Sequence, residues 1–161
     1  MLQKFFVGYI DRVIDGDTLE VSINTGFGIQ LKNQRLRLMN VDCPESRTSD
    51  DEEKVYGLKA KEFTKKWCQL NTDVEDNMRA ILQIEFNEDG EYMKDSFGRI
   101  LGNIFACNKQ SLLFSVPTLL ILKSSLVEEI ISHYHGVRYV GQPKSNIQEK
   151  HIRNRSLICD L

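Results

Sequence analysis

The sequence predicts an α+β protein in which five strands and about three helices form one domain over residues 1–161. Several short segments alternate apolar and polar residues and are separated by turns rich in glycine and aspartate, as half-buried strands are. Two longer segments repeat apolar residues at the helical period. No linker, repeat or low-complexity tract divides the chain, and 161 residues suffice to enclose a core of their own.

The first three predicted strands follow one another closely along the chain. Phe5–Val13 is the first, and Asp15–Asp17 provides the turn after it. Thr18–Ile23 alternates apolar and polar residues and is expected to pair with the first strand as a hairpin. Arg35–Leu38 alternates arginine with leucine and is the third strand. Because the connections are short, we expect an antiparallel meander.

A polar loop and a helix should come next. Ser46–Lys54 carries an acidic run that we interpret as a solvated loop rather than a second metal site. The period of apolar residues predicts a helix over Val55–Leu70. Its apolar stripe, expected in the core, consists of Tyr56, Ala60, Phe63, Trp67 and Leu70.

The second half of the chain completes the strands and adds two helices. Ala80–Phe86 and Phe97–Ala106 are strand candidates, and Asp89–Gly90 marks a turn between them. Helical periodicity covers Thr118–Tyr134, with a proline close to its start. A short final helix is predicted over Ser145–Leu157.

Composition sets limits on the class of protein. The net charge of −2 and the pI of about 5.9 count against a protein that coats nucleic acid non-specifically, which usually needs a basic face. The four cysteines contain no Cys-x-x-Cys pair, which argues against zinc and a disulfide framework and suits a reducing compartment. No signal peptide or membrane-spanning segment is evident. We therefore expect a soluble intracellular protein, cytoplasmic and without a membrane partner.

The stretch Arg35–Glu45 contains several charged residues that could act together in catalysis. On a flat strand, Arg37 and Asp42 would face opposite sides of the sheet. A bend near Asn40 would allow Arg37, Asp42 and Glu45 to converge, and a cation beside paired carboxylates is what metal-assisted attack on a phosphodiester needs. The alternative is a surface strand with salt bridges that ends in a tight turn at Pro44.

Other polar residues can also be interpreted either as part of a functional site or as ordinary surface and turn residues. Asp15 and Asp17 offer hard oxygen ligands from a tight turn, although such a sequence is often only a turn. Arg37 and Arg99 could each bind phosphate oxygens through the guanidinium, or could simply be solvated. Of the histidines, His133 and His135 would diverge on a helix and His151 is expected to be exposed. We therefore expect none of the three to take part in the site.

Taken together, three segments resemble the signatures of the staphylococcal nuclease (thermonuclease) family. They are Val13-Ile-Asp-Gly-Asp-Thr18, Arg37-Leu-Met-Asn-Val-Asp-Cys-Pro-Glu45 and Asp95-Ser-Phe-Gly-Arg99, and their order and spacing match. Tyr56-Gly-Leu-Lys-Ala-Lys-Glu-Phe-Thr-Lys-Lys66 also resembles the first helix of that family. The resemblance covers roughly Phe5–Leu157. It implies an OB-fold, a five-stranded Greek-key barrel with three helices.

The resemblance also implies a function. Members hydrolyse DNA and RNA phosphodiesters with calcium and leave 5′-hydroxyl and 3′-phosphate ends. The alternative is a non-catalytic nucleic-acid-binding module, since degenerate domains of the family keep the barrel and lose the catalytic residues. All the polar catalytic residue types are present here, which favours the nuclease. The expected partner is DNA or RNA.

Site residues are carried over position by position from the resemblance. The calcium ligands would be Asp17, Asp42 and the backbone carbonyl of Cys43, with Asp15 acting through water. The proposed general base is Glu45. The two phosphate-binding arginines are Arg37 and Arg99. The residue that stacks on the nucleotide is Tyr139.

The chain also departs from the family pattern. Cys43 replaces a threonine of which only the backbone oxygen is needed, and Gly141 replaces a second stacking tyrosine. Ser96 and Phe97 replace a lysine and a tyrosine that help to hold a nucleotide phosphate. An insertion around Ser111–Ser125 lengthens the connection to the second helix. We expect it to bury itself at the start of that helix in a monomer, while an apolar dimer contact is the alternative.

Overall fold

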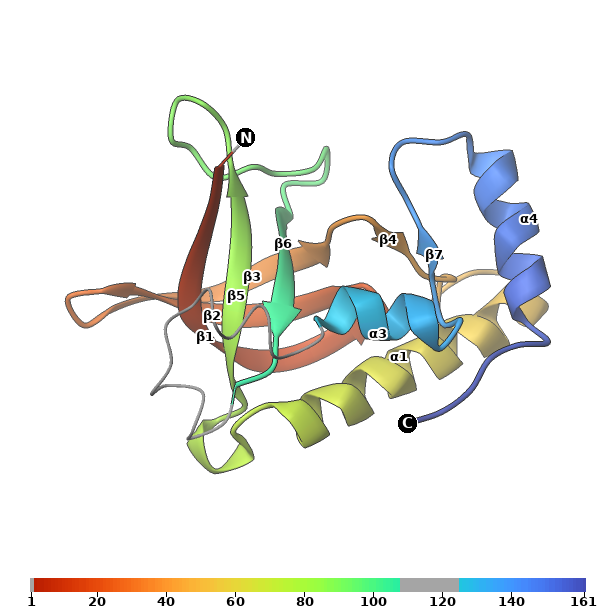
Figure 1. The fold of residues 1–161 in the computed structure, drawn as a ribbon, viewed down its shortest axis with the longest axis horizontal. Coiled ribbons are helices and arrows are strands. Elements are labelled where there is room, and N and C mark those ends of the chain that lie inside the picture. The colour runs from red at the N-terminus through yellow and green to blue at the C-terminus, as the bar shows by residue number, and fades with distance from the viewer. Residues whose placement is uncertain (1, 108–124) are drawn as a thin grey trace.

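The computed structural model describes residues 2–107 and 125–161, and its centre is a closed β-barrel (Figure 1). The strands stand in the order β1-β2-β3-β6-β5 around the barrel. They are β1 (Leu2–Asp15), β2 (Thr18–Gly26), β3 (Ile29–Leu38), β5 (Arg79–Phe86) and β6 (Ile100–Phe105). Neighbouring strands are antiparallel except β3 and β6, which pair in parallel. The predicted meander of the first three strands and the OB-fold are confirmed.

β1 is longer than predicted at both ends and β2 is three residues longer at its end, and the starts of β3 and β6 differ from their predicted positions for local reasons. β3 begins at Ile29, six residues before the expected Arg35. Its first half is exposed along its whole length but still pairs with β2, so no buried face marks it as a strand in the sequence. β6 begins at Ile100 and not at Phe97. Residues 95–99 form a tight turn instead, in which Gly98 has a φ of 77° and its amide donates to the carbonyl of Asp95 at 3.0 Å.

Helix α1 (Asp51–Asn71) runs beneath the barrel strands in the view of Figure 1. It begins four residues before the predicted Val55. The carboxylate of Asp50 caps it by accepting from the amides of Glu52 and Glu53, both at 3.0 Å. The acidic run is therefore not a loop, because acidic side chains favour the first turn of a helix. Leu70 was expected in the core and is 66% exposed. A short 3-10 helix, η1 (Val74–Asp76), leads from α1 to β5.

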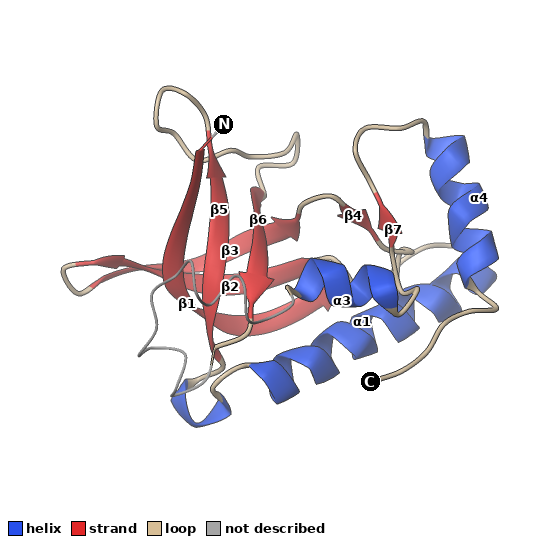
Figure 2. Ribbon diagram, in the orientation of Figure 1, coloured by secondary structure: helices blue, strands red, loops and turns tan. Residues whose placement is uncertain are grey.

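Helices α3 (Leu126–Ser132) and α4 (Lys144–Asn154) complete the fold, as Figure 2 shows. The predicted segment Thr118–Tyr134 lies partly outside the described residues. Within them the helix begins after the cap Ser125 and stops before Tyr134, whose φ of 63° is left-handed. Residues 111–124 of the predicted insertion also lie outside the described part. α4 ends three residues before the predicted Leu157.

The core fills the barrel and the layer between the barrel and α1. Its largest fully buried side chains include Trp67 from α1, Leu19 from β2 and Leu36 from β3. Among residues 2–107 and 125–161, no helix is long and apolar enough to cross a bilayer. Beside the barrel, β4 (Val41–Asp42) pairs antiparallel with β7 (Val137–Arg138). This two-stranded ribbon lies between the barrel and α4 (Figure 1).

Candidate active site

The chain bends between β3 and β4, where Asn40 has a left-handed φ of 60°. Arg37 closes this bend: its Nη1 donates to the carbonyl of Leu38 at 2.7 Å and to that of Val41 at 2.8 Å. Asparagine tolerates the left-handed conformation better than most residues. The bend predicted near Asn40 is confirmed.

The same guanidinium joins two carboxylates. Its Nη2 lies 3.1 Å from Oδ2 of Asp17 and 3.2 Å from Oδ1 of Asp42, and the Arg37 side chain is only 14% exposed. The strand arginine is thus neither free nor solvated. Arg37 and Asp42 converge as the sequence predicted, and Asp17 joins them from the turn before β2. Glu45, the third residue of the predicted convergence, lines a cavity together with Asp42 and does not bond to this guanidinium.

Asp17 is buried and held by several donors. Its Oδ2 accepts from the amide of Cys43 at 2.9 Å, and its Oδ1 accepts from the hydroxyl of Thr18 at 3.0 Å. Burial raises the pKa of the Asp17 carboxyl, and the nearby Arg37 guanidinium opposes this rise. The carboxylate is therefore fixed in orientation, and its charge is balanced mainly by one arginine.

The turn before Asp17 packs tightly against α1. A Cβ on Gly16 would lie 2.8 Å from the Cβ of Ala60, and the Thr64 hydroxyl donates to the Gly16 carbonyl at 2.7 Å. Asp15, on the other side of this glycine, accepts from the Ser46 amide at 3.3 Å and from the Ser46 hydroxyl. Asp15 therefore ties the turn to the segment that follows Glu45.

Cys43 and Glu45 follow β4 directly. The Cys43 thiol is buried, and burial raises its pKa well above the usual range, so that the side chain stays a neutral thiol. Much of the Glu45 side chain is open to solvent. The part of its carboxyl surface that the protein covers raises its pKa, and the carboxylates of Asp17, Asp15 and Asp42 raise the pKa further. Glu45 therefore lies within the electrostatic field of the three aspartates.

Arg99 reaches the site from the turn before β6. Its Nε donates to Oδ2 of Asp95 at 2.6 Å, and its Nη1 donates to the Thr18 hydroxyl at 3.3 Å. Burial opposes ionisation of Asp95, but hydrogen bonds from the amide and side chain of Arg99 and from the Phe97 amide outweigh it and lower the Asp95 pKa. Thr18 thus touches both Asp17 and Arg99, a link that sequence reasoning missed.

Two cavities adjoin these residues. One, of about 530 Å³, is lined by Arg37, Arg99, Phe97 and Tyr139 among others. The second, of about 590 Å³, is lined by Asp42, Cys43, Glu45 and again Tyr139, together with residues of α4. Tyr139 therefore stands between the two cavities, with its amide donating to the Asn40 carbonyl at 3.0 Å.

The sequence profile of the family described as staphylococcal nuclease homologue matches residues 35–116, just over half of the chain. The chain belongs to this family. The resemblance seen in the sequence is thereby confirmed, and the barrel with the three α-helices of the described residues agrees with it. A comparison with curated proteins finds no match to the chain.

The staphylococcal nuclease match takes in Arg37, Asp42, Cys43, Glu45 and Arg99. Other residues of the site lie outside the matched range and join it only through the fold. Asp15 and Asp17 come from the preceding turn, and Tyr139 follows β7. Among the residues that the structure describes, no three His, Cys, Asp or Glu side chains are placed to hold a metal by themselves. A metal at this site would therefore need backbone or water ligands as well.

The histidines depart from the sequence prediction. His151 was expected to be exposed and is 7% exposed, with its Nε2 2.9 Å from Oδ2 of Asp42. The signal that could have found it is its spacing of four residues from Ile147 on α4, since both side chains are buried. His133 and His135 do not share a helix, and His135 packs on Phe63 with ring centres 4.4 Å apart.

Proposed function

We propose that this staphylococcal nuclease homologue is a calcium-dependent nuclease that hydrolyses DNA, RNA or both to 5′-hydroxyl and 3′-phosphate ends. The observation that carries the proposal is the meeting of Asp17 and Asp42 at one guanidinium, that of Arg37. Arg99 and Glu45 line the two cavities next to this point. Cation and carboxylate groups are thus gathered where a phosphodiester could lie.

The donor set fits calcium. Calcium takes about six to eight oxygen ligands, including carboxylates, backbone carbonyls and water. Asp17, Asp42 and the carbonyl of Cys43 would hold it, and Asp15 would act through water. The carboxylates of Asp17 and Asp42 already share one cationic group, so that their charges are turned toward a common point. When bound, the ion would polarise the phosphate and acidify a water molecule.

The residues of the chain would divide the remaining work. The raised pKa of Glu45 makes its carboxylate a better proton acceptor at neutral pH, which suits a group that orients or deprotonates the attacking water. Arg37 and Arg99 would neutralise charge that develops on the phosphate oxygens. Both are already oriented by hydrogen bonds, and such preorganised groups are the effective ones.

The nucleotide would lie in the cavity of about 530 Å³. Tyr139 and Phe97 border this cavity with exposed rings, which can stack on bases without reading sequence. Phe97 has no hydroxyl to offer a phosphate. We therefore propose that affinity there rests on stacking and on the two arginines, consistent with the net charge of −2.

The test is cleavage of single-stranded DNA and RNA by the purified protein with calcium, and again with a chelator. The Asp17→Asn variant keeps the shape of the side chain and removes its charge. Asp11→Asn is a matched control, because Asp11 is exposed on β1 and, within residues 2–107 and 125–161, its carboxylate accepts only from the Ser22 hydroxyl, at 2.8 Å. We expect fragments with calcium alone, their loss in Asp17→Asn and their retention in Asp11→Asn. Intact nucleic acid from a folded protein would overturn the nuclease in favour of the binding module, whose retention of nucleic acid at physiological salt could then be measured.

A further inference from the structure

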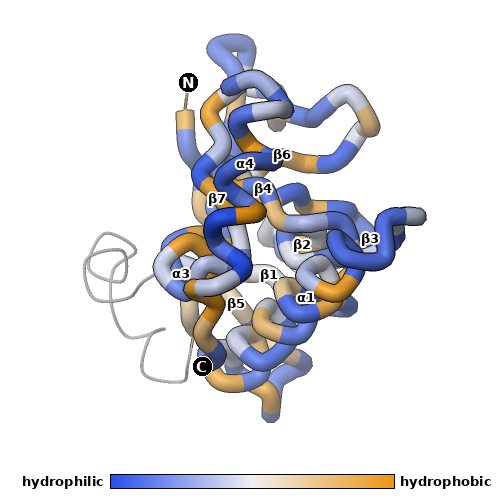
Figure 3. The backbone as a smooth tube through the Cα atoms, turned by 90° about the vertical axis from the view of Figure 1, so that its right-hand side faces the viewer, coloured by the Kyte–Doolittle hydropathy of each residue, from blue (hydrophilic) through white to orange (hydrophobic). Residues whose placement is uncertain are grey.

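Helix α4 presents one face to the candidate site. Lys144, Ile147 and Gln148 line the cavity of about 590 Å³ together with His151. Their spacing of three or four residues places them along one side of the helix. Figure 3, viewed from the α4 side, shows this mostly hydrophilic helix lying next to β4 and β7. On this face Ile147 and His151 are buried.

The buried His151 bonds directly to Asp42. Its Nε2 lies 2.9 Å from Oδ2 of Asp42. An ionised carboxylate can only accept hydrogen bonds, so Nε2 carries the hydrogen and donates it. On the other oxygen, Arg37 donates to Oδ1 at 3.2 Å. The Asp42 carboxylate thus accepts one hydrogen bond from the barrel, through Arg37, and one from α4, through His151.

These two hydrogen bonds matter because the Asp42 side chain is more exposed to solvent than that of Asp17. The Asp42 side chain is 35% exposed, whereas that of Asp17 is 11% exposed. Each carboxylate oxygen has a further lone pair available beyond the one that accepts from Arg37 or His151. The two donors therefore fix the carboxylate plane and still leave acceptor sites toward the cavity.

We propose that His151 is a positioning residue that orients Asp42 for calcium, which makes α4 a part of the metal site. The proposal rests on the proposed function and deepens it. Hydrogen-bond partners of metal ligands set the orientation of those ligands, and their loss typically weakens metal affinity by about tenfold to a hundredfold. His151 lies 109 residues from Asp42 along the chain, so the link exists only in the folded protein.

A purely structural role would be to attach α4 to its neighbours. Asn154 does this work on the same helix, because its Nδ2 donates to the Gly136 carbonyl at 3.2 Å. That bond joins α4 to the segment before β7 and touches no predicted calcium ligand. Asn154→Ala is therefore a matched control: it removes one hydrogen bond of α4 and leaves the Asp42 contact in place.

The experiment is calorimetric titration of the full chain with calcium chloride, without nucleic acid. His151→Gln places an amide N–H donor near the position of Nε2. His151→Asn carries the same amide group on a side chain one methylene shorter, which cannot reach Asp42. We expect His151→Asn to weaken calcium binding by about tenfold to a hundredfold and His151→Gln to stay within about threefold of the wild type. Asn154→Ala should lower the melting temperature in chelator without changing calcium affinity.

Equal calcium affinity in His151→Asn and the wild type would overturn the proposal, as would an equal loss in Asn154→Ala. Should His151→Asn unfold, His151→Leu, which keeps bulk and has no donor, is compared with His151→Gln in its place. If the wild-type protein binds no calcium, that result contradicts both the proposed calcium-dependent function and this inference. If it binds calcium and the His151 variants bind equally well, only the inference is overturned.

Discussion

The Nη2 atom of Arg37 lies 3.1 Å from the Oδ2 atom of Asp17, although Arg37 lies on β3 and Asp17 in the turn between β1 and β2. The strand register explains the contact. Thr18 of β2 is paired with Arg37 of β3, and the amide of Leu38 donates to the Asp17 carbonyl at 2.8 Å. The turn that carries Asp17 is therefore held at the end of β3, where the bend brings Asp42 to the same guanidinium.

Arg37→Ala should destabilise the fold as well as abolish cleavage. The change leaves the Asp17 and Asp42 carboxylates without their shared cation and the carbonyls of Leu38 and Val41 without their donor. Breaking a buried ion pair from one side typically costs about 3–5 kcal/mol. Urea unfolding in chelator measures the loss. Arg35→Ala, at an exposed position of the same strand, should change the free energy of unfolding by less than about 0.5 kcal/mol. Equal effects of the two changes would contradict the assignment.

Arg99→Ala and Glu45→Ala should instead slow cleavage while the fold persists. Both residues lie at the cavities and neither is fully buried. In Arg99→Ala, the Asp95 carboxylate keeps the amides of Phe97 and residue 99 as donors. Loss of a positioned charge donor costs about 10²–10³ in rate, and loss of a general base about 10²–10⁴. Initial rates on single-stranded DNA, beside circular dichroism of each variant, measure the effect.

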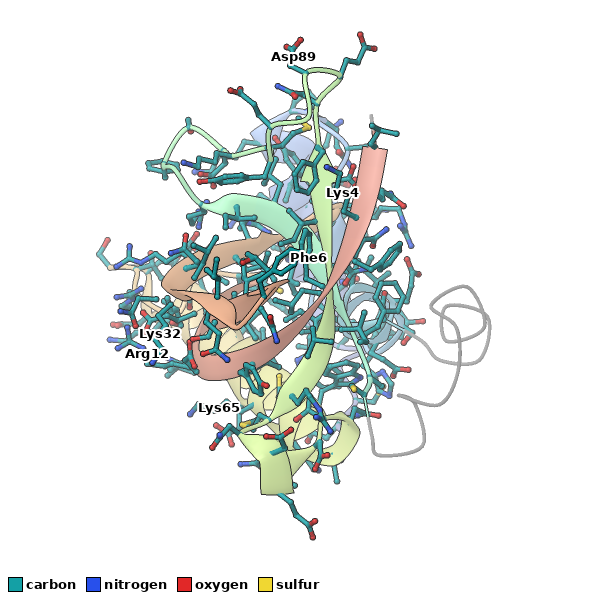
Figure 4. The ribbon with its side chains drawn as sticks, turned by 90° about the vertical axis from the view of Figure 1, so that its left-hand side faces the viewer. Lys4, Phe6, Arg12, Lys32, Lys65 and Asp89 are labelled. Atoms are coloured by element: carbon teal, nitrogen blue, oxygen red, sulfur yellow. The ribbon has the colours of Figure 1, made fainter. Side chains whose placement is uncertain are left out.

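Arg12→Ala is the control for this pair of variants. Arg12 projects from the outer surface of the barrel in Figure 4 and pairs with Glu20 at 2.9 Å, outside both cavities. Its loss should leave the rate within about twofold of the wild type, since single surface ion pairs contribute little. A fully active Arg99→Ala or Glu45→Ala protein would show that the role given to that residue is wrong.

Gly57→Ala should destabilise the protein, although alanine is the better helix former by about 1 kcal/mol. A Cβ on this α1 glycine would lie 2.3 Å from the carbonyl oxygen of Glu45 and 2.5 Å from the amide nitrogen of Ser46. The Glu45 segment must move away, at a cost of about 1–3 kcal/mol, and cleavage should fall with it. Leu58→Ala, at the exposed neighbouring position, is the control. A stabilised, fully active Gly57→Ala protein would refute this close packing.

Stability should fall on mild acidification because of His135. Burial lowers the pKa of this imidazole, and its Nε2 donates to the Cys159 carbonyl at 3.0 Å. Between the usual histidine pKa of about 6.5 and the lowered folded value, the unfolded chain binds more protons than the native protein. The free energy of unfolding therefore decreases as the pH falls through this window. His135→Gln cannot titrate, so its curve between about pH 5 and pH 7 should be flatter; parallel curves would contradict the prediction.

Local chemistry made part of the fold predictable. The bend at Asn40 follows from the residues around it, and the alternation in Thr18–Ile23 follows from one buried face. The start of α1 also has a local signal, because Asp50 followed by Glu53 resembles a capping box, although the density of acidic residues there is equally typical of a solvated loop.

Contacts between distant segments could not be predicted in the same way. The parallel pairing of β3 with β6 brings Arg99 next to Thr18, and neither strand alone carries a signal for it. The burial of His151 depends on how α4 docks on β4 and β7, which local periodicity does not determine. The resemblance to a family therefore assigns Asp42 a role as a calcium ligand, but it does not show that His151 bonds to this carboxylate.

The most direct test of the central claim is the chemistry of the cleaved ends. Single-stranded DNA is digested with calcium, and the fragments are offered to polynucleotide kinase with labelled ATP, either directly or after phosphatase treatment. The proposed nuclease predicts fragments that form only with calcium and accept label directly, because their 5′ ends are hydroxyls. Fragments that need phosphatase first, or that form equally well in chelator, would contradict the account.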